Sequence, residues 1–230
     1  WKVPEDMSSE IMALLDPMGV AVRAVEVAKT CSGRVESALT HDATVVVQGS
    51  GMIGILVAMV AKMAGASKII MTGGGDKRLK LAKDVVDIDQ TINIFEKDVD
   101  QRVEIVKDMT GGRGADLVFE CCGVPEAVLE ALRMARRMST VVSLGNLTNP
   151  GQYIKIDPCR DLVLKHVTLQ GMVANPPRSF DQAFAILDGF KHKIPFEKLI
   201  THKFPVKDTI KALDASTDVD NCVKAMMINK

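Results

Sequence analysis

The sequence of 230 residues predicts an α/β fold, a doubly wound parallel sheet of six strands with helices on both faces. Short β-branched runs alternate with longer segments of helical periodicity through the middle of the chain, which is typical of such a sheet. One of these runs leads directly into a glycine-rich loop that opens an apolar helix. With 47% hydrophobic residues, the chain can bury the sizeable core that this fold requires.

Each element follows from its local pattern. Near-continuous apolar runs favour strands buried on both faces of a sheet; we predict them at Thr44–Gln48, Lys68–Thr72, Thr91–Ile94, Ala115–Glu120, Thr140–Leu144 and His166–Gln170. Apolar residues three and four apart favour helices; we predict them at Met52–Met63, Asp76–Lys83, Asp98–Met109 and Pro125–Arg137. Right-handed crossovers between the strands then leave few topologies open.

The flanking segments follow other patterns. Residues Ser8–Ala28 predict a helix with serine caps, bent or split at Pro17. After Gly171 we expect a proline-bearing link, a helix, a strand, a second helix and a terminal apolar run, at Asn175–Pro177, Phe180–Phe190, Leu199–Phe204, Val206–Ala215 and Cys222–Ile228.

Composition excludes several classes of protein. Lys and Arg number 29 and Asp and Glu 29, so no basic excess indicates a nucleic-acid or membrane partner. The five cysteines (Cys31, Cys121, Cys122, Cys159 and Cys222) form no C-x-x-C pair, which argues against a disulfide framework and a zinc knuckle. The most apolar stretch, Met52–Ala61, is shorter than a membrane span. We expect a soluble cytoplasmic protein, and the first residue, Trp1, suggests a piece of a longer chain.

The sharpest motif is the G-x-G-x-x-G loop that follows the first predicted strand. Gly49 permits the tight turn, Gly51 lets backbone approach a pyrophosphate, and Gly54 lets helix and strand pack closely. The amides of Met52 and Ile53 would face the phosphates at the positive end of the helix dipole. This is the pattern of a Rossmann-type dinucleotide site; a merely structural glycine turn is the alternative.

The second half of that pattern is altered. An acid that binds the adenosine ribose is expected about 20 residues on, yet Gly73 ends the second strand. Without that carboxylate, and with Lys77 and Arg78 close by, a 2′-phosphate is better tolerated, so NADP is slightly favoured over NAD. Alternatively, Asp76 caps the following helix while the two cations are solvated, or Asp76 itself reaches the ribose.

Seven pieces in order resemble one family, the zinc-type medium-chain dehydrogenases/reductases that act on alcohols, polyols and threonine. They are Asp16-Pro17 with Ala21-Val22, VVVQGSGMIG, KIIMTGGGDKRLKLAK, GRGADLVFECCG, VVSLG, HVTLQG and LITHKFPV. The resemblance implies that Cys121 and Cys122 line the nicotinamide side through shape and backbone, not as thiolates. It also implies contacts from Leu144, Gly145 and Met172 to the nicotinamide.

The resemblance further implies what this chain lacks. In the family a separate N-terminal domain supplies the catalytic zinc, so zinc is expected only in the full-length enzyme, with no catalytic or metal residue here. Asp16, Glu120 and His202 match family positions and are interpreted as structural. Residues 1–36 would then belong to the linker from that domain, 37–178 to the dinucleotide-binding domain, and 179–230 to a segment that packs on the missing domain.

One departure concerns a turn. The segment from Asp84 to Asp89 offers no glycine for the left-handed helix cap that relatives use, so the turn must be built differently.

Two hypotheses of function follow. The first is the NAD(P)-binding portion of a dehydrogenase that transfers hydride between substrate carbon and nicotinamide, inactive or nearly so by itself. The second is a stand-alone NAD(P)-binding or sensor module; the unpartnered apolar run Cys222–Ile228 argues against it, and the family pieces argue against a methyltransferase. The edge strand near His166–Gln170 predicts a homodimer or tetramer.

Overall fold

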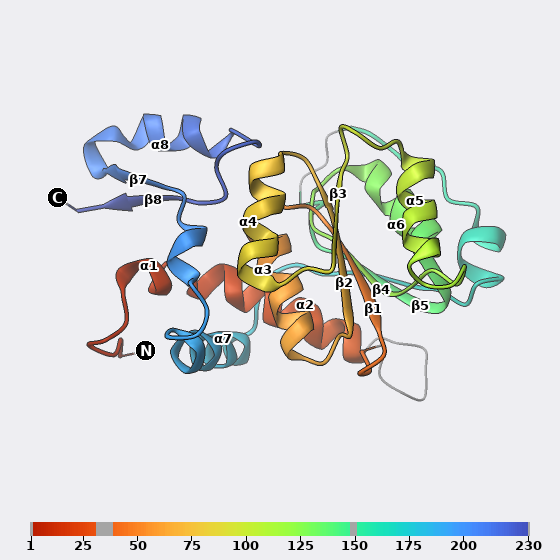
Figure 1. The fold of residues 1–230 in the computed structure, drawn as a ribbon, viewed down its shortest axis with the longest axis horizontal. Coiled ribbons are helices and arrows are strands. Elements are labelled where there is room, and N and C mark those ends of the chain that lie inside the picture. Colours follow the sequence, from red (N-terminus) through yellow and green to blue (C-terminus); the bar gives the residue numbers. More distant parts are fainter. Residues whose placement is uncertain (1, 31–38, 148–150, 230) are drawn as a thin grey trace.

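The fold is built on one parallel sheet. The computed structural model describes residues 2–30, 39–147 and 151–229 (Figure 1), so Cys31 and the boundary predicted between residues 36 and 37 lie outside the described residues. Six strands lie in the order β3-β2-β1-β4-β5-β6, all parallel, which is the predicted Rossmann-type arrangement. Their bounds are β1 Thr44–Gln48, β2 Lys68–Gly73, β3 Gln90–Asn93, β4 Ala115–Glu120, β5 Ala135–Ser143 and β6 Thr168–Gly171.

Helices cover both faces of the sheet (Figure 1). On one face lie α2 Leu15–Thr30, α3 Met52–Met63 and α4 Asp76–Val86, and on the other α5 Val99–Asp108 and α6 Pro125–Met134. Side chains alternate between the two cores: Val45 and Val47 of β1 pack under α3, whereas Val46 packs under α5 and α6. The strand order reverses between β1 and β4, which opens a crevice at the carboxyl edge of the sheet.

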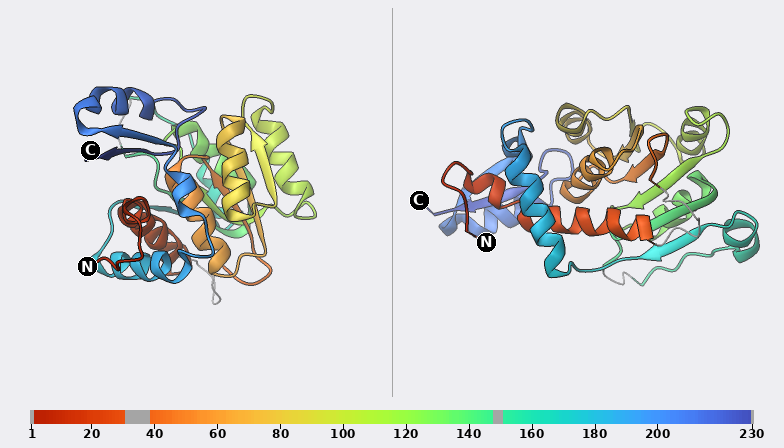
Figure 2. Two further views of the ribbon diagram at one scale, coloured as in Figure 1. Left: turned by 60° about the vertical axis from the view of Figure 1, so that its left-hand side comes forward. Right: turned by 90° about the horizontal axis from the view of Figure 1, so that it is seen from below.

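The ends of the chain meet beside this sheet. Helix α7 (Pro177–Phe190) packs across α2 (Figure 2), and a short helix α1 (Ser9–Met12) precedes α2. The C-terminal segment forms a separate two-stranded parallel sheet of β7 (His202–Pro205) and β8 (Ala225–Ile228), covered by α8 (Thr209–Ser216). A π-helix at Pro158–Val163 and 3-10 turns at Phe196–Leu199 and Val206–Asp208 complete the described elements.

Several predicted bounds are corrected by the structure. The helix predicted to end at Arg137 ends at Met134, because the chain continues directly into β5, whose first residue, Ala135, pairs with Ala115. The last strand of the sheet starts at Thr168 and not at His166, which has a φ of 52° that no strand accommodates.

The remaining differences lie in the flanks. The predicted helix Ser8–Ala28 is split into two helices, capped at Ser8 as expected, and Pro17 lies in the first turn of α2. The break falls at Ala13, four residues before Pro17, where a continuous helix would need the N–H that proline lacks. The strand predicted at Leu199–Phe204 begins only at His202, after a 3-10 turn, and the helix predicted from Val206 begins at Thr209. No helix in the described part of the chain is long and apolar enough to cross a membrane.

Candidate functional site

The glycine loop lies at the crevice between β1 and β4. Gly49 has a φ of 111°, and a Cβ there would lie 3.2 Å from the backbone of Cys121. A Cβ on Gly54 would come within 1.9 Å of the Gly49 carbonyl oxygen, so helix α3 packs too closely for any other residue. At Gly51 a Cβ would meet no described atom within 4 Å, and this residue caps α3 without a side-chain hydrogen bond. The loop therefore combines a tight turn, close packing and an open approach to the helix N-terminus, whose first residues are Met52 and Ile53.

A cavity of about 420 Å³ opens beside this loop. The cavity is lined by six of the residues predicted to bind the cofactor, namely Gly49, Gly51, Gly73, Arg78, Cys121 and Cys122. Seven others lie outside its lining: Met52, Ile53, Gly54, Lys77, Leu144, Gly145 and Met172. The sequence interpretation missed further lining residues, among them Gln48, Phe95, Arg102, Glu130 and Val219.

The end of β2 lacks room for a side chain. A Cβ on Gly73 would lie 2.4 Å from the Ser50 hydroxyl oxygen and 2.9 Å from the Ser50 backbone nitrogen. The Ser50 hydroxyl in turn donates a hydrogen bond of 2.9 Å to the carbonyl oxygen of Gly74. Ser50 of the glycine loop thus occupies the space that an acidic side chain at position 73 would need. This packing accounts for glycine, in place of the expected acid, at the end of β2.

The two cations after β2 contact the C-terminal segment. The Lys77 ammonium donates to the Asn221 side-chain oxygen at 2.7 Å. The Arg78 guanidinium donates to the carbonyl oxygens of Asp218, at 3.1 Å, and of Cys222. The alternative that both cations are merely solvated is therefore wrong. So is capping by Asp76, because α4 begins at that residue without a side-chain cap.

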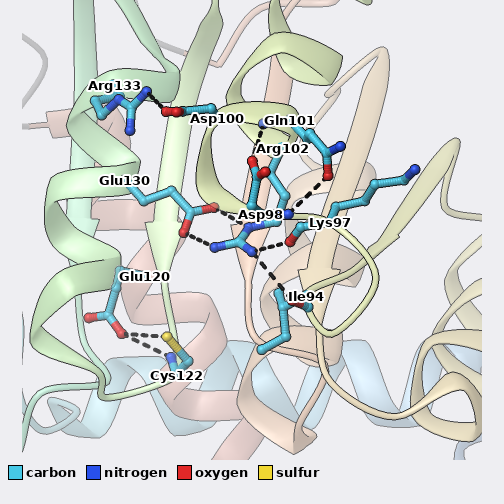
Figure 3. Close-up of polar contacts among 10 residues, drawn as sticks. All are labelled: Ile94, Lys97, Asp98, Asp100, Gln101, Arg102, Glu120, Cys122, Glu130 and Arg133. Atoms are coloured by element: carbon cyan, nitrogen blue, oxygen red, sulfur yellow. Dashed lines mark hydrogen bonds and ion pairs between the residues drawn. The ribbon is translucent and has the colours of Figure 1, made fainter.

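A buried carboxylate organises the loop after β4. Glu120 is fully buried, and one of its oxygens accepts from the amide of Cys122 at 2.9 Å (Figure 3). The same oxygen accepts from the amide of Gly123 at 2.7 Å. Its other oxygen accepts from the Ser143 hydroxyl at 2.7 Å and the Asn146 amide at 2.8 Å. The side chain thereby joins the ends of β4 and β5, which is a structural role.

The adjacent cysteines are poor nucleophiles in this setting. Burial raises the pKa of the Cys121 thiol well above its ordinary value, and the neighbouring Glu120 carboxylate raises it further. Burial also raises the pKa of the Cys122 thiol to about 12. Both side chains are therefore neutral thiols at physiological pH, which agrees with a contribution of shape and backbone.

Three predicted residues follow the next two strands. The amides of Leu144 and Gly145 both donate to the Glu120 carbonyl oxygen, at 3.0 and 3.1 Å. The Met172 amide donates to the Ser143 carbonyl oxygen at 2.9 Å. All three thus lie at the carboxyl edge on the β5-β6 side and do not line the cavity, whose lining comes from residues at and after the ends of β1, β2, β3 and β4.

An ion pair forms one wall of the cavity. The Arg102 guanidinium of α5 donates to both carboxylate oxygens of Glu130 of α6, at 2.8 and 2.7 Å, and both residues are buried (Figure 3). No periodic signal in the sequence separates these two residues from exposed charges on the same helices. Their pairing depends on how α5 and α6 pack, so the sequence could not reveal it.

The described residues form no cluster of metal-binding side chains. Across residues 2–30, 39–147 and 151–229, no three His, Cys, Asp or Glu side chains gather in a way that could hold a metal ion. His202 lies in β7 and stacks on Phe204, with ring centroids 6.3 Å apart, and Asp16 lies in the first turn of α2. Neither residue is placed to bind a metal with a second and third ligand.

The chain resembles known proteins over its whole length. Residues 53–189 match the family model of the zinc-binding dehydrogenases. The L-threonine 3-dehydrogenase of Bacillus velezensis is 31% identical over 229 residues, which cover 99% of this chain and 60% of that protein. An alcohol dehydrogenase structure from Thermotoga maritima superposes with a TM-score of 0.87 at 28% identity, covering 100% of this chain and 60% of the other.

A further structure shares the fold with a cofactor bound. It is a protein of Sinorhizobium meliloti 1021 assigned to the zinc-binding dehydrogenases and solved with NADP, with a TM-score of 0.80 at 24% identity. The superposition covers 99% of this chain and 62% of that one. The chain thus spans about 60% of the length of the relatives that it matches.

Proposed function

The chain belongs to the zinc-binding dehydrogenase family, and we propose that it forms the NAD(P)-binding portion of an oxidoreductase acting on an alcohol, polyol or hydroxy-amino acid. Relatives that match nearly the whole chain include an L-threonine 3-dehydrogenase and an alcohol dehydrogenase, which supports the proposed class of substrate. The bound nicotinamide would accept or deliver the hydride that the substrate carbon exchanges. Residues of this chain would bind and orient that cofactor.

The observation that carries the proposal is the open glycine loop at the N-terminus of α3. Gly51 leaves free space where a side chain would stand, and the amides that begin α3 supply the positive end of a helix dipole. A pyrophosphate fits such a cradle because it needs close backbone approach and several N–H donors. The neighbouring cavity of about 420 Å³ has the size of part of a dinucleotide.

We expect a modest preference for NADP over NAD. Gly73 presents no carboxylate to repel a 2′-phosphate, and the hydrogen bonds of Lys77 and Arg78 go to neutral oxygens, so their charges are not neutralised by those contacts. The hydrogen bond from the Asn221 side chain lowers the pKa of Asp218, and the nearby Arg78 cation lowers it a little further; the Asp218 carboxylate would repel the same phosphate. Because the cations attract the 2′-phosphate and the carboxylate repels it, we expect only a small difference in affinity between NADP and NAD.

The nicotinamide half would lie further toward β5 and β6, next to Cys121 and Cys122, which also line the cavity. Cys121, Cys122, Leu144, Gly145 and Met172 are the residues expected to border it, through backbone and shape. The loop that bears the cysteines is held by Glu120, so its geometry is fixed before any ligand arrives.

The chain alone is expected to be inactive or nearly so. Since its described residues do not gather a zinc site, the metal and half of the substrate cleft would come from a separate domain. In this division residues 1–36 form the linker from the separate domain, and residues 37–178 bind the dinucleotide. Residues 179–230 pack against the separate domain. Exposed apolar residues on and beside α8, Val206, Ile210 and Leu213, support such packing.

Assembly would use the free edge of the large sheet. Strand β6 is the last strand of that sheet and pairs only with β5 among the described strands. An unpaired edge favours association with a second copy, so a homodimer or tetramer is proposed. Light scattering across micromolar concentrations tests this, and a monomeric mass throughout would contradict it.

The alternative is a stand-alone NAD(P)-binding module without redox chemistry. It predicts a folded, monodisperse chain whose C-terminal surface needs no partner. The exposed apolar side chains near α8 favour the dehydrogenase portion instead. The two are distinguished by turnover, which should appear only when the chain is extended upstream.

The test is a calorimetric titration of the chain with NAD+, NADH, NADP+ and NADPH in parallel. We expect binding of all or some of them, with NADP(H) slightly tighter. The matched variant is Gly51→Val, because a Cβ at this position meets no described atom within 4 Å and the branched side chain would fill the space proposed for the pyrophosphate. It should fold like the parent and lose dinucleotide binding; tight binding by the variant, or no binding by the parent, would contradict the proposal.

A further inference from the structure

Gln48, the last residue of β1, is a buried polar residue in an otherwise apolar strand. Its exposed fraction is 2%, it precedes the glycine loop directly, and it lines the cavity. Its carboxamide oxygen has no hydrogen-bond partner among the described residues. Because an unpaired buried acceptor costs free energy, such a group is an indication of a ligand that completes it.

Among the residues that line the cavity, the Nε of Arg78 is also buried without a hydrogen-bond partner, although the same guanidinium donates to two carbonyl oxygens through its Nη2. Arg102 and Glu130 satisfy each other through two hydrogen bonds, and Ser50 donates to Gly74. Gln48 shares its face of the sheet with Val46, two residues earlier, which packs under α5 and α6. Its carboxamide thus lies on the side of the crevice that α5 and α6 cover, and Arg102 and Glu130 of these helices line the same cavity.

This side of the crevice fits the adenosine half of a dinucleotide, an assignment that rests on the proposed function. In such folds the ribose lies at the end of the second strand, which here is Gly73 in the cavity lining. Beyond it the wall is apolar and is made by Ile94, Phe95, Val99 and Val124. Phe95 and Val124 are largely exposed, with 71% and 49% of their surface free, as expected of side chains that await a flat base.

We propose that Gln48 recognises the adenine base of the cofactor. A carboxamide pairs with the N6/N7 edge of adenine through two hydrogen bonds, accepting from the N6 amine and donating to N7. Gln48 offers this acceptor and donor from a rigid strand at the inner end of an apolar slot. Hypoxanthine, which carries an oxygen in place of the amine, would leave two acceptors facing each other.

The experiment compares adenine with hypoxanthine dinucleotides. The chain is titrated calorimetrically with NAD+ or NADP+, whichever binds more tightly, and with the same coenzyme containing hypoxanthine. We expect the hypoxanthine form to bind about tenfold more weakly or worse, the discrimination typical of one bidentate pair. This comparison needs no variant, so it stands even if a substitution prevents folding.

Two variants assign the discrimination to Gln48. Gln48→Met keeps the shape but removes both hydrogen-bonding groups, and should bind the two coenzymes about equally. Thr140→Val removes another buried, unpartnered oxygen of the same sheet that does not line the cavity, and should keep the parent's ratio.

The outcomes separate this inference from the proposed function. Equal affinity of the parent chain for both bases would overturn the role of Gln48 while leaving the dinucleotide site intact. Discrimination that persists in Gln48→Met would also overturn it, because another group would then read the base. If no dinucleotide binds, the proposed function itself fails, and the role of Gln48 fails with it.

Discussion

The guanidinium of Arg102 and the carboxylate of Glu130 face each other through two hydrogen bonds of 2.8 and 2.7 Å, with both side chains about nine-tenths buried (Figure 3). The pair joins α5 to α6 beside the cavity. Arg102 also donates to the Lys97 carbonyl oxygen at 2.6 Å, so it fixes the loop that carries Phe95. The hydrogen bonds from Glu130 raise the pKa of Arg102, which stays charged at any accessible pH.

Removal of one partner of this ion pair should therefore lower the free energy of unfolding more than replacement of both partners by apolar residues. Glu130→Ala leaves a buried guanidinium unpaired and should lower the free energy of unfolding by about 3–5 kcal/mol. The double variant with methionine at Arg102 and Glu130 should recover most of that loss. Urea denaturation measures both.

A second ion pair between the same helices provides the control. Arg133 and Asp100 also join α6 to α5, but their side chains are 46% and 81% exposed. Asp100→Ala should change the free energy of unfolding by no more than about 1 kcal/mol. If Glu130→Ala and Asp100→Ala lowered the free energy of unfolding equally, burial would not be what makes the Arg102–Glu130 pair sensitive to the loss of one partner.

The contact between Glu10 and Lys203 should make stability depend on pH. Glu10 of α1 accepts a hydrogen bond from the Lys203 ammonium of β7, which lowers the pKa of Glu10 from its ordinary 4.5 to about 2. A carboxyl whose pKa is lower in the folded state stabilises the fold above its unfolded pKa. That contribution is lost as the pH falls from about 4.5 to about 2. Because Lys203 is 43% exposed, we expect no more than about 1 kcal/mol.

The measurement is urea denaturation of the parent and Glu10→Gln at pH 6, 4 and 3. The parent should be more stable at pH 6, and the difference should shrink toward pH 3. Lys203→Met should remove the same contribution from the other side of the contact. A difference that stays constant over this range would show that Glu10 does not titrate as stated.

The cysteines differ in their expected reactivity. With a pKa of about 12, roughly one Cys122 thiol in ten thousand is ionised at pH 8. Although its side chain reaches the surface, Cys122 should be alkylated by iodoacetamide far more slowly than Cys159, which is also exposed. Mass spectrometry of the peptides measures each rate. In the urea-denatured chain the two rates should become similar, and equal rates in the folded chain would refute the prediction.

The sequence predicted those parts of the molecule that depend on neighbours in the chain. The run Thr44–Gln48 and the glycines after it specify β1, its turn and α3, because each residue acts on its own backbone. The contact of Lys77 with Asn221 joins residues 144 positions apart, so no local pattern reveals it. Arg102 and Glu130 likewise have the composition of exposed helix residues, and only the packing of two helices buries them.

The turn after α4 shows how the chain builds a left-handed helix cap without glycine. Asp87 caps the helix in the left-handed conformation, with φ 57° and ψ 59°, and its amide donates to the Lys83 carbonyl oxygen at 3.0 Å. Lys62 donates to the Asp87 carbonyl oxygen at 3.1 Å and holds the turn from α3. A non-glycine residue in this conformation carries backbone strain, although aspartate carries less than most.

Asp87→Gly should therefore stabilise the fold by about 0.5 kcal/mol, since the strain relieved slightly exceeds the added freedom of the unfolded chain. The Asp87 side chain is almost fully exposed, so the loss of its contact with Lys62 costs little. Asp84→Gly, three residues earlier inside α4, is the matched control and should destabilise by about 0.5 kcal/mol, because glycine is the poorer helix former. Thermal unfolding of both variants measures the two effects; a loss of stability in Asp87→Gly would show that the aspartate itself holds the turn.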